Sequence, residues 1–171
     1  MKPVIQFGLF SGIVSAIWQY AKYQHGLTNI NLGGLAGFVP HLFLFVVIAV
    51  AVYYQRSSAE FGVGNVPFKE AAKTGVYISI ITGLCLAGYT MLYGLVINPT
   101  YLQEWADFVR EGLEKQHKSQ DIIEQQIAEI NSTGALGSLM FGAFTTSLVI
   151  GMIGSMIIAG LLKREPEGSP E

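Results

Sequence analysis

Four long stretches without a charged residue constrain this chain more than any other feature of its sequence. They run over about residues 3–21, 35–54, 74–97 and 135–162. Each is close to or longer than the roughly 20 apolar residues that an α-helix needs to cross the hydrocarbon core of a bilayer. Because the chain has only 171 residues, four such helices leave no room for a large catalytic domain. The sequence therefore predicts an all-α membrane protein with four transmembrane helices.

The composition agrees with a membrane protein and argues against a nucleic-acid-binding protein or a disulfide-rich one. Hydrophobic residues make up 51% of the chain and charged residues only 13%, which is about half the charged fraction of an ordinary soluble domain. The formal net charge of −2 offers no basic surface to nucleic acid. A single cysteine, Cys85, excludes an internal disulfide framework or a cysteine metal cluster. A cleaved signal peptide is the alternative for residues 3–21, but its apolar stretch would be shorter and no small-x-small cleavage site follows.

The borders of the spans predict how the chain is threaded. We expect Pro40 in the first turn of the second span, where a missing N–H is tolerated. With four spans, the amino end, the connection 55–73 and the tail share one side of the membrane, and that side holds most of the bases: Lys2, Arg56, Lys69, Lys73, Lys163 and Arg164. Since lysine and arginine are retained in the cytoplasm, both termini are predicted to be cytoplasmic and segment 99–134 periplasmic. Residues 1–164 form one domain, and residues 165–171 a disordered tail.

Segment 100–131 predicts helices outside the membrane. Its apolar residues Leu102, Trp105, Val109 and Leu113 recur at helical spacing, opposite a charged side that holds Glu104, Asp107, Glu111, Glu114 and Lys118. Thr100 with Gln103 matches a capping box, and Glu111 with Lys115 and Glu114 with Lys118 are favourable i,i+4 pairs. A polar break precedes Ser119, a plausible N-cap of a second helix with Ile123, Ile127 and Ile130 on one stripe. We expect an extramembrane amphipathic hairpin, or two helices lying on the outer interface.

Small residues recur every four positions in three of the spans. Such stripes let helices approach closely in lipid, where no hydrophobic driving force brings them together. The expected helix-packing residues are Gly8, Gly12, Gly75, Ser79, Gly83, Gly142, Gly151 and Ser155. The last span carries two stripes, Ser138–Gly142–Thr146 and Ser147–Gly151–Ser155–Ala159, which indicates two neighbours. Both are expected to pack inside the bundle, although one neighbour of this span could instead be another chain.

The predicted spans contain few side chains that could carry out catalysis or bind an ion. None contains Asp, Glu, Lys or Arg, the residues on which proton relays and ion-coupled carriers are usually built. We predict no catalytic, cofactor-binding or metal-binding residue and no cofactor. His25 and His41 fall near the outer ends of the first two spans and could face one metal or haem iron, but interfacial hydrogen bonding is the simpler reading. Candidate residues for docking a partner are Trp105, Val109, Leu113, Glu104, Asp107 and Glu111.

The order of these parts resembles a known family. The motifs that carry the resemblance are Phe7–Gly12, the second span ending in Tyr54 and Arg56, Val66–Gly75, and Tyr101–Ile127 with its break before Ser119. They are similar to the bacterial membrane family called domain of unknown function 4199. That resemblance implies a four-span protein of the bacterial inner membrane and carries over no activity or catalytic residue. The glycine pair Gly62 and Gly64 departs from the single glycine expected there.

Two hypotheses for function follow. The first is a non-enzymatic accessory or scaffold protein that acts through helix packing and its outer acidic hairpin. Its partners would be the lipid bilayer and either itself or a larger membrane complex. The alternative is a small transporter or pore, formed by oligomerisation around Gln6, Gln19 and the threonines of the spans. An enzyme at the outer interface comes third, because it would require His25 and His41 to converge.

Overall fold

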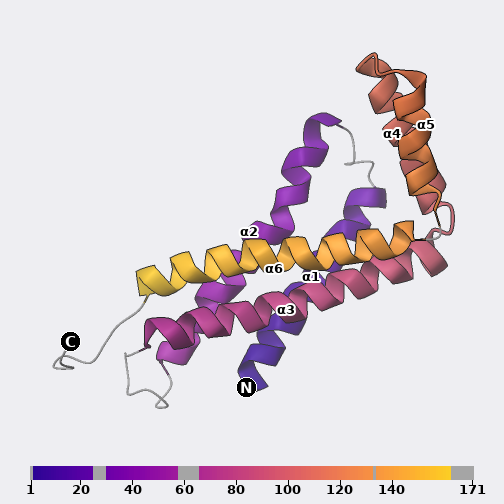
Figure 1. Ribbon diagram of the computed structural model, residues 1–171. Helices are drawn as coiled ribbons and strands as arrows, with labels where there is room; N and C mark the ends of the chain where they lie inside the picture. The colour runs from indigo at the N-terminus through magenta and orange to yellow at the C-terminus, as the bar shows by residue number, and fades with distance from the viewer. Residues whose placement is uncertain (1, 25–29, 58–65, 133, 163–171) are drawn as a thin grey trace. The chain divides into compact units, whose positions relative to one another are not determined.

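A computed structural model describes residues 2–24, 30–57, 66–132 and 134–162, with the backbone alone for residues 30–35. These described parts are all-helical (Figure 1). The elements are α1 (Lys2–Gln24), α2 (Ile30–Arg56), α3 (Phe68–Leu92), the π-helical turn η2 (Tyr93–Ile97), α4 (Tyr101–Lys115), α5 (Gln120–Ile130) and α6 (Ala135–Leu162). His25, the Gly62–Gly64 stretch and the tail predicted to be disordered lie outside the described residues.

Four of the described helices are long and apolar enough to cross a membrane. They are Lys2–Gln24, Ala36–Arg56, Phe68–Ile97 and Ala135–Leu162. This number agrees with the four uncharged stretches of the sequence. The third helix begins at Phe68, six residues before the predicted span, so Lys69, Glu70 and Lys73 lie in its first two turns, in agreement with a helical entry into that span.

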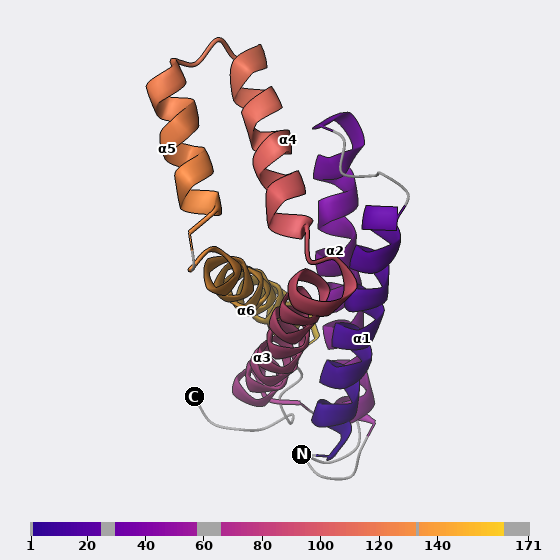
Figure 2. The same cartoon turned by 90° about the vertical axis from the view of Figure 1, so that its right-hand side faces the viewer.

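The chain divides into two compact units, each described here by itself. The first contains residues 1–86 and 144–171, and the second contains residues 87–143. In the first unit, α1 and α2 run side by side in opposite directions (Figures 1 and 2). Helix α2 supplies half of the buried apolar core, which includes Leu44, Ile48 and Val52, with Ile78 from α3 and Ile158 from α6.

Proline 40 lies inside α2, so its expected place in a first turn is wrong. A proline within a helix has no N–H to donate to the carbonyl four residues before it, which here is Ala36. The indole of Trp18 in α1 compensates, because its Nε1–H donates to Ala36 O at 2.9 Å. Such a substitute donor from a neighbouring helix is what allows proline within a span. The carbonyl left without its partner in α2 therefore forms a hydrogen bond between α1 and α2.

In the second unit, the helix that starts with α3 changes its winding at Tyr93. Asn98 N donates to Tyr93 O at 2.7 Å, five residues back, which gives η2 its π-helical geometry. Pro99 then ends the helix, since it cannot continue the ladder. The ring of Tyr93 is buried and lies against Tyr89 and Tyr101, with ring centroids 5.7 and 5.3 Å away. These three tyrosines connect the end of α3 to the start of α4.

Candidate functional site

Helices α3 and α6 meet in the first unit through a reciprocal pair of glycine and serine residues. A Cβ added to Gly75 would overlap the side chain of Ser155, and one added to Gly151 would overlap the side chain of Ser79. Each serine hydroxyl donates to the glycine carbonyl one turn earlier in its own helix, Ser79 to Gly75 and Ser155 to Gly151. Both hydroxyls are fully buried. We call these four residues the glycine–serine interface; they bring two backbones close together while leaving no hydroxyl without a partner.

Helix α1 reaches α3 through two further glycines. A Cβ on Gly8 would lie 2.7 Å from Ile81 Cβ, and one on Gly12 would overlap Cys85. Thr82 Oγ1 also donates to Gly8 O across the two helices at 3.3 Å. Glycine is therefore required sterically at both positions, and a buried side chain-to-backbone hydrogen bond accompanies the contact.

Gly83 and Gly142 were both expected at helix contacts, but only Gly83 lies against another helix. A Cβ on Gly83 would lie 3.0 Å from the ring of Phe144, so α6 covers this glycine. Gly142 is exposed, and a Cβ built there has nothing within 4 Å. Its stripe neighbours Ser138 and Thr146 are exposed as well. Of the two stripes of α6, the one with Gly151 is buried within the chain, while the one with Gly142, which we call the open stripe, is not.

The helices α4 and α5 pack against each other in the second unit, side by side and in opposite directions (Figure 2). We call them the α4–α5 pair. Buried Ala106, Ile123 and Ile127 form its core, and Val109 and Leu113 pack against that core. Two of the expected docking residues, Val109 and Leu113, are thus used to join the two helices rather than presented on the surface.

The exposed apolar part of α4 is an aromatic pair. The rings of Trp105 and Phe108 are stacked with centroids 6.0 Å apart and an interplanar angle of 29°. About a third of each residue is exposed. Phe108 was absent from the expected docking residues, although its spacing of three from Trp105 already places it on a neighbouring part of the helix surface. The nearby side chain of Asp107 is exposed.

The side chain of Glu104 forms hydrogen bonds with residues at the start of α4. It accepts hydrogen bonds from Asn98 Nδ2 and from Thr100 Oγ1, both at 2.9 Å. The predicted capping box of Thr100 and Gln103 is therefore wrong, because the Thr100 hydroxyl caps no backbone amide. The backbone of Thr100 is not extended (φ −88°, ψ 1°), so its hydroxyl is directed to the Glu104 carboxylate instead. At α5, Ser119 does occupy the N-cap position with extended backbone, but its hydroxyl makes no capping bond.

Glu111 forms the ion pair expected from the sequence. Lys115 Nζ donates to Glu111 Oε1 at 2.6 Å. This hydrogen bond, together with the positive charge of Lys115, holds the pKa of the Glu111 carboxyl below its usual value. Both side chains are well exposed, so the pair adds little to stability and will weaken with salt.

His41 is half-buried in α2, with Nδ1 lying 3.2 Å from Gly37 O one turn earlier. His25 lies outside the described residues, so the structure does not bring the two histidines together. Within the described ranges, no group of three or more His, Cys, Asp or Glu residues could hold a metal ion.

Comparison with known proteins gives the family of the chain. A family model described as "Protein of unknown function (DUF4199)" matches residues 6–164, so the chain belongs to that family. Searches of curated proteins and of solved structures each found no match to it.

Proposed function

We propose that this member of the DUF4199 family is an integral, non-enzymatic accessory or scaffold protein of the bacterial inner membrane. In this proposal both termini are cytoplasmic, and the α4–α5 pair is an extramembrane hairpin on the periplasmic side. The protein docks through the open stripe of α6 onto a transmembrane helix of a second copy or of a larger membrane complex.

The distribution of basic residues supports the orientation. Lys2 begins α1, Arg56 ends α2, and Lys69 and Lys73 lie at the start of α3. These three helix ends lie together, because residues from all of them line one cavity. Segment 99–134, in contrast, holds seven acidic and three basic residues. Lysine and arginine next to span ends mark the cytoplasmic side.

Labelling of introduced cysteines tests this orientation. In a chain with Cys85→Ser, the exposed positions Ser57 and Glu124 are each replaced by cysteine. A membrane-impermeant maleimide should label Glu124→Cys in intact spheroplasts, and Ser57→Cys only after the membrane is opened. Labelling of both from the same side would contradict the proposed threading.

The observation that carries the docking proposal is the contrast between the two stripes of α6. The stripe with Gly151 and Ser155 is buried against α3, whereas Ser138, Gly142 and Thr146 are exposed. Small residues have no advantage on a lipid-facing surface, but they permit close approach of another helix. The exposed aromatic pair Trp105–Phe108 adds a second contact of the kind enriched at protein interfaces.

Substitution of Gly142 tests the docking role. The tagged protein is cross-linked in its native membrane, extracted in mild detergent, and analysed for what accompanies it in stoichiometric amount. Gly142→Leu should lose that second chain. The matched control is Gly137→Leu, because Gly137 is equally exposed with open space around it and lies about 140° away around the helix. A wild-type protein that is monomeric in both membrane and detergent would contradict the proposal.

A pore formed by several copies is the second candidate. One observation favours it: the amide of Gln6 is exposed on α1 within a candidate span. An amide facing hydrocarbon lacks hydrogen-bond partners, so polar contact with another copy or with a water-filled lumen would stabilise it. Gln6→Leu should then change solute flux in reconstituted vesicles without changing the amount of folded protein. Unchanged flux for ions and small neutral solutes would remove the support for this candidate.

A further inference from the structure

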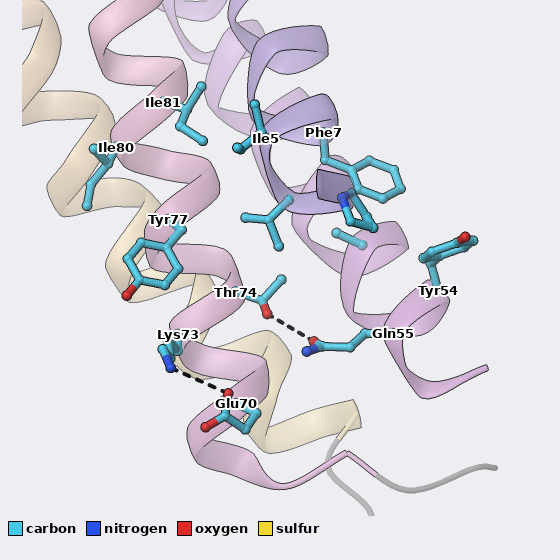
Figure 3. Close-up of a pocket in the computed structure, with 13 residues that line it drawn as sticks. Ile5, Phe7, Tyr54, Gln55, Glu70, Lys73, Thr74, Tyr77, Ile80 and Ile81 are labelled. Carbon is cyan, nitrogen blue, oxygen red and sulfur yellow. Dashed lines mark hydrogen bonds and ion pairs between the residues drawn. The ribbon is translucent and has the colours of Figure 1, made fainter. Parts of the chain in front are cut away.

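A cavity of about 370 Å³ lies in the first unit between α1, α2 and α3. Its volume is in the range of small-molecule binding sites. Figure 3 shows that Ile5 of α1 and Ile81 of α3 point into the space between their helices, while Gln55 and Thr74 meet at one end. The residues that line it include Ile5, Tyr54, Gln55, Lys73, Thr74 and Ile81.

The wall formed by α1 and α3 is apolar and open at the side. Ile5 is 47% exposed and Tyr77 is 42% exposed, although both line the cavity. Because α1 and α3 are candidate spans, the surface on which these residues lie faces hydrocarbon rather than water. An acyl chain can therefore enter from the bilayer between the two helices. Phe7 and Tyr54 also line the cavity, and their rings meet edge to face with centroids 6.1 Å apart.

The end of the cavity nearest the helix termini is polar. Buried Thr74 donates from Oγ1 to Gln55 Oε1 at 2.9 Å, which joins α3 to α2. Lys73 directly precedes Thr74, and its Nζ lies 3.8 Å from Oε2 of Glu70, one turn earlier in α3. That pair is long and about half of the Lys73 side chain is exposed, so the ammonium can turn toward a stronger anionic partner at little cost.

Two charged residues line the cavity itself, Lys73 and Glu70. Among the described residues of the three helix ends that meet here, Lys2, Arg56 and Lys69 add three positive charges outside the lining. Basic groups between transmembrane helices at the membrane surface are the arrangement that recognises anionic lipid headgroups. Polar, positive groups at the surface and an apolar, laterally open wall below them match the two halves of such a lipid.

We propose that this cavity binds one anionic phospholipid, with its phosphate beside Lys73 and one acyl chain against Ile5 and Ile81. The apolar wall distinguishes this ligand from a soluble phosphate compound, and the basic rim distinguishes it from a neutral or zwitterionic lipid. The site is separate from the open stripe of α6 and does not depend on the docking role proposed above.

Native mass spectrometry of the full chain in mild detergent tests the proposal. Phosphatidylglycerol, phosphatidylcholine with the same acyl chains, and glycerol 3-phosphate are added separately. The wild type should retain one phosphatidylglycerol in preference to phosphatidylcholine, and no glycerol 3-phosphate. Lys73→Gln should weaken phosphatidylglycerol binding about fivefold and leave phosphatidylcholine binding unchanged. Ile5→Trp, which fills the groove, should weaken phosphatidylglycerol binding about tenfold.

Two variants make matched controls. Ile13→Trp places the same ring on an exposed part of α1 outside the cavity, and Lys118→Gln makes the same charge change in the second unit. Both should bind phosphatidylglycerol as the wild type does. If Ile5→Trp does not fold, Ile80→Trp tests the α3 wall in its place. Equal binding by Ile5→Trp and Ile13→Trp, or by Lys73→Gln and Lys118→Gln, would overturn the proposal, as would retention of glycerol 3-phosphate.

Discussion

The interfaces between α3 and α6 and between α4 and α5 are built from opposite kinds of residue. Glycine and serine form the first, where Gly75 meets Ser155 and Ser79 meets Gly151. Isoleucine forms most of the second, where Ile123 and Ile127 pack with Ala106 and are flanked by Val109 and Leu113. Both join antiparallel helices of one short chain, so the difference does not come from the type of secondary structure.

The difference is the one expected from our proposal that the α4–α5 pair lies in water while α3 and α6 lie in lipid. In water, burying aliphatic surface stabilises by about 25 cal/mol for each Å² of area, so large side chains are favoured. In lipid, an isoleucine gains nothing by leaving hydrocarbon, and helices associate through close backbone approach and hydrogen bonds. Residue size at a helix interface thus reports the medium around it, which is consistent with the α4–α5 pair lying outside the membrane.

The largest effect is expected from overpacking the glycine–serine interface. Gly151→Leu would force α6 away from Ser79 and Leu44, because even a Cβ overlaps there. We expect the free energy of unfolding to fall by about 3 kcal/mol. The measurement is helical circular dichroism as sodium dodecyl sulfate is titrated into detergent micelles. Gly142→Leu is the control: the same change on the open stripe should leave the stability of the single chain unchanged, and an equal loss for both variants would contradict the contrast.

Creating a cavity in the α4–α5 pair by shortening a buried side chain should have the next largest effect on stability. Ile123 is 1% exposed, and Ile123→Ala should lower the stability of this pair by about 2 kcal/mol, since a two-helix unit can partly collapse around the space. Hydrogen exchange of the amides of α4 and α5 measures this local stability. Ile122→Ala removes the same atoms from a side chain that is 43% exposed, and it should leave exchange nearly unchanged. Comparable acceleration by both would mean that burial does not stabilise the pair.

The turn after α4 offers a smaller, stabilising change. His117 has a positive φ of 55°, and Lys118 N donates to Leu113 O at 3.1 Å in a Schellman-type ending. A residue with a Cβ is strained in this conformation, so His117→Gly should stabilise the α4–α5 pair by about 1 kcal/mol. The same exchange measurement applies. His117→Ala keeps the Cβ and should bring no gain; a gain equal to that of glycine would show that the imidazole, not the backbone, is unfavourable.

The smallest effect concerns Glu111 on the exposed face of α4. Its carboxyl has a lowered pKa because of the hydrogen bond from Lys115 and the charge of that lysine. The ionised pair therefore favours the folded state above the ordinary carboxyl pKa, and this contribution is lost as the pH falls through the lowered value. Carbon-13 NMR titration should show the Glu111 pKa rising toward its ordinary value in Lys115→Gln. Lys118→Gln should leave it in place, and identical titration in all three chains would disprove the assignment.

The spans could be predicted from sequence because charge is excluded from hydrocarbon at every position of a helix. The four uncharged stretches therefore marked four helices, and the small-residue spacing placed Gly75, Ser79, Gly151 and Ser155 on faces that the structure brings together. The predicted span began at residue 74, six residues after the start of α3, because Lys69 and Lys73 can extend from a helix end to the membrane surface, so charge marks a boundary only within a turn or two.

The remaining features depend on contacts between segments, which spacing within one segment cannot give. Periodicity placed Gly142 and Gly151 on separate stripes of α6 but contained nothing to indicate which stripe a neighbour covers. Val109 and Leu113 were expected to dock a partner because spacing within α4 cannot show that they pack against Ile123 and Ile127 of α5. The cavity likewise lies where three helix ends meet in space.

The hydrogen bond from Trp18 to Ala36 fixes the axial position of α1 relative to α2. The ring contacts Phe7–Tyr54 and Phe10–Phe43 also join α1 to α2, but they are apolar and supply no donor to a backbone carbonyl. The carbonyl of Ala36 requires such a donor, because Pro40 has removed its partner within α2 and hydrocarbon offers no other donor. Only one position of α1 places an indole N–H there. The hydrogen bond that Pro40 removes from α2 thus determines the register of α1. Trp18 and Pro40 act together, although they lie in different helices.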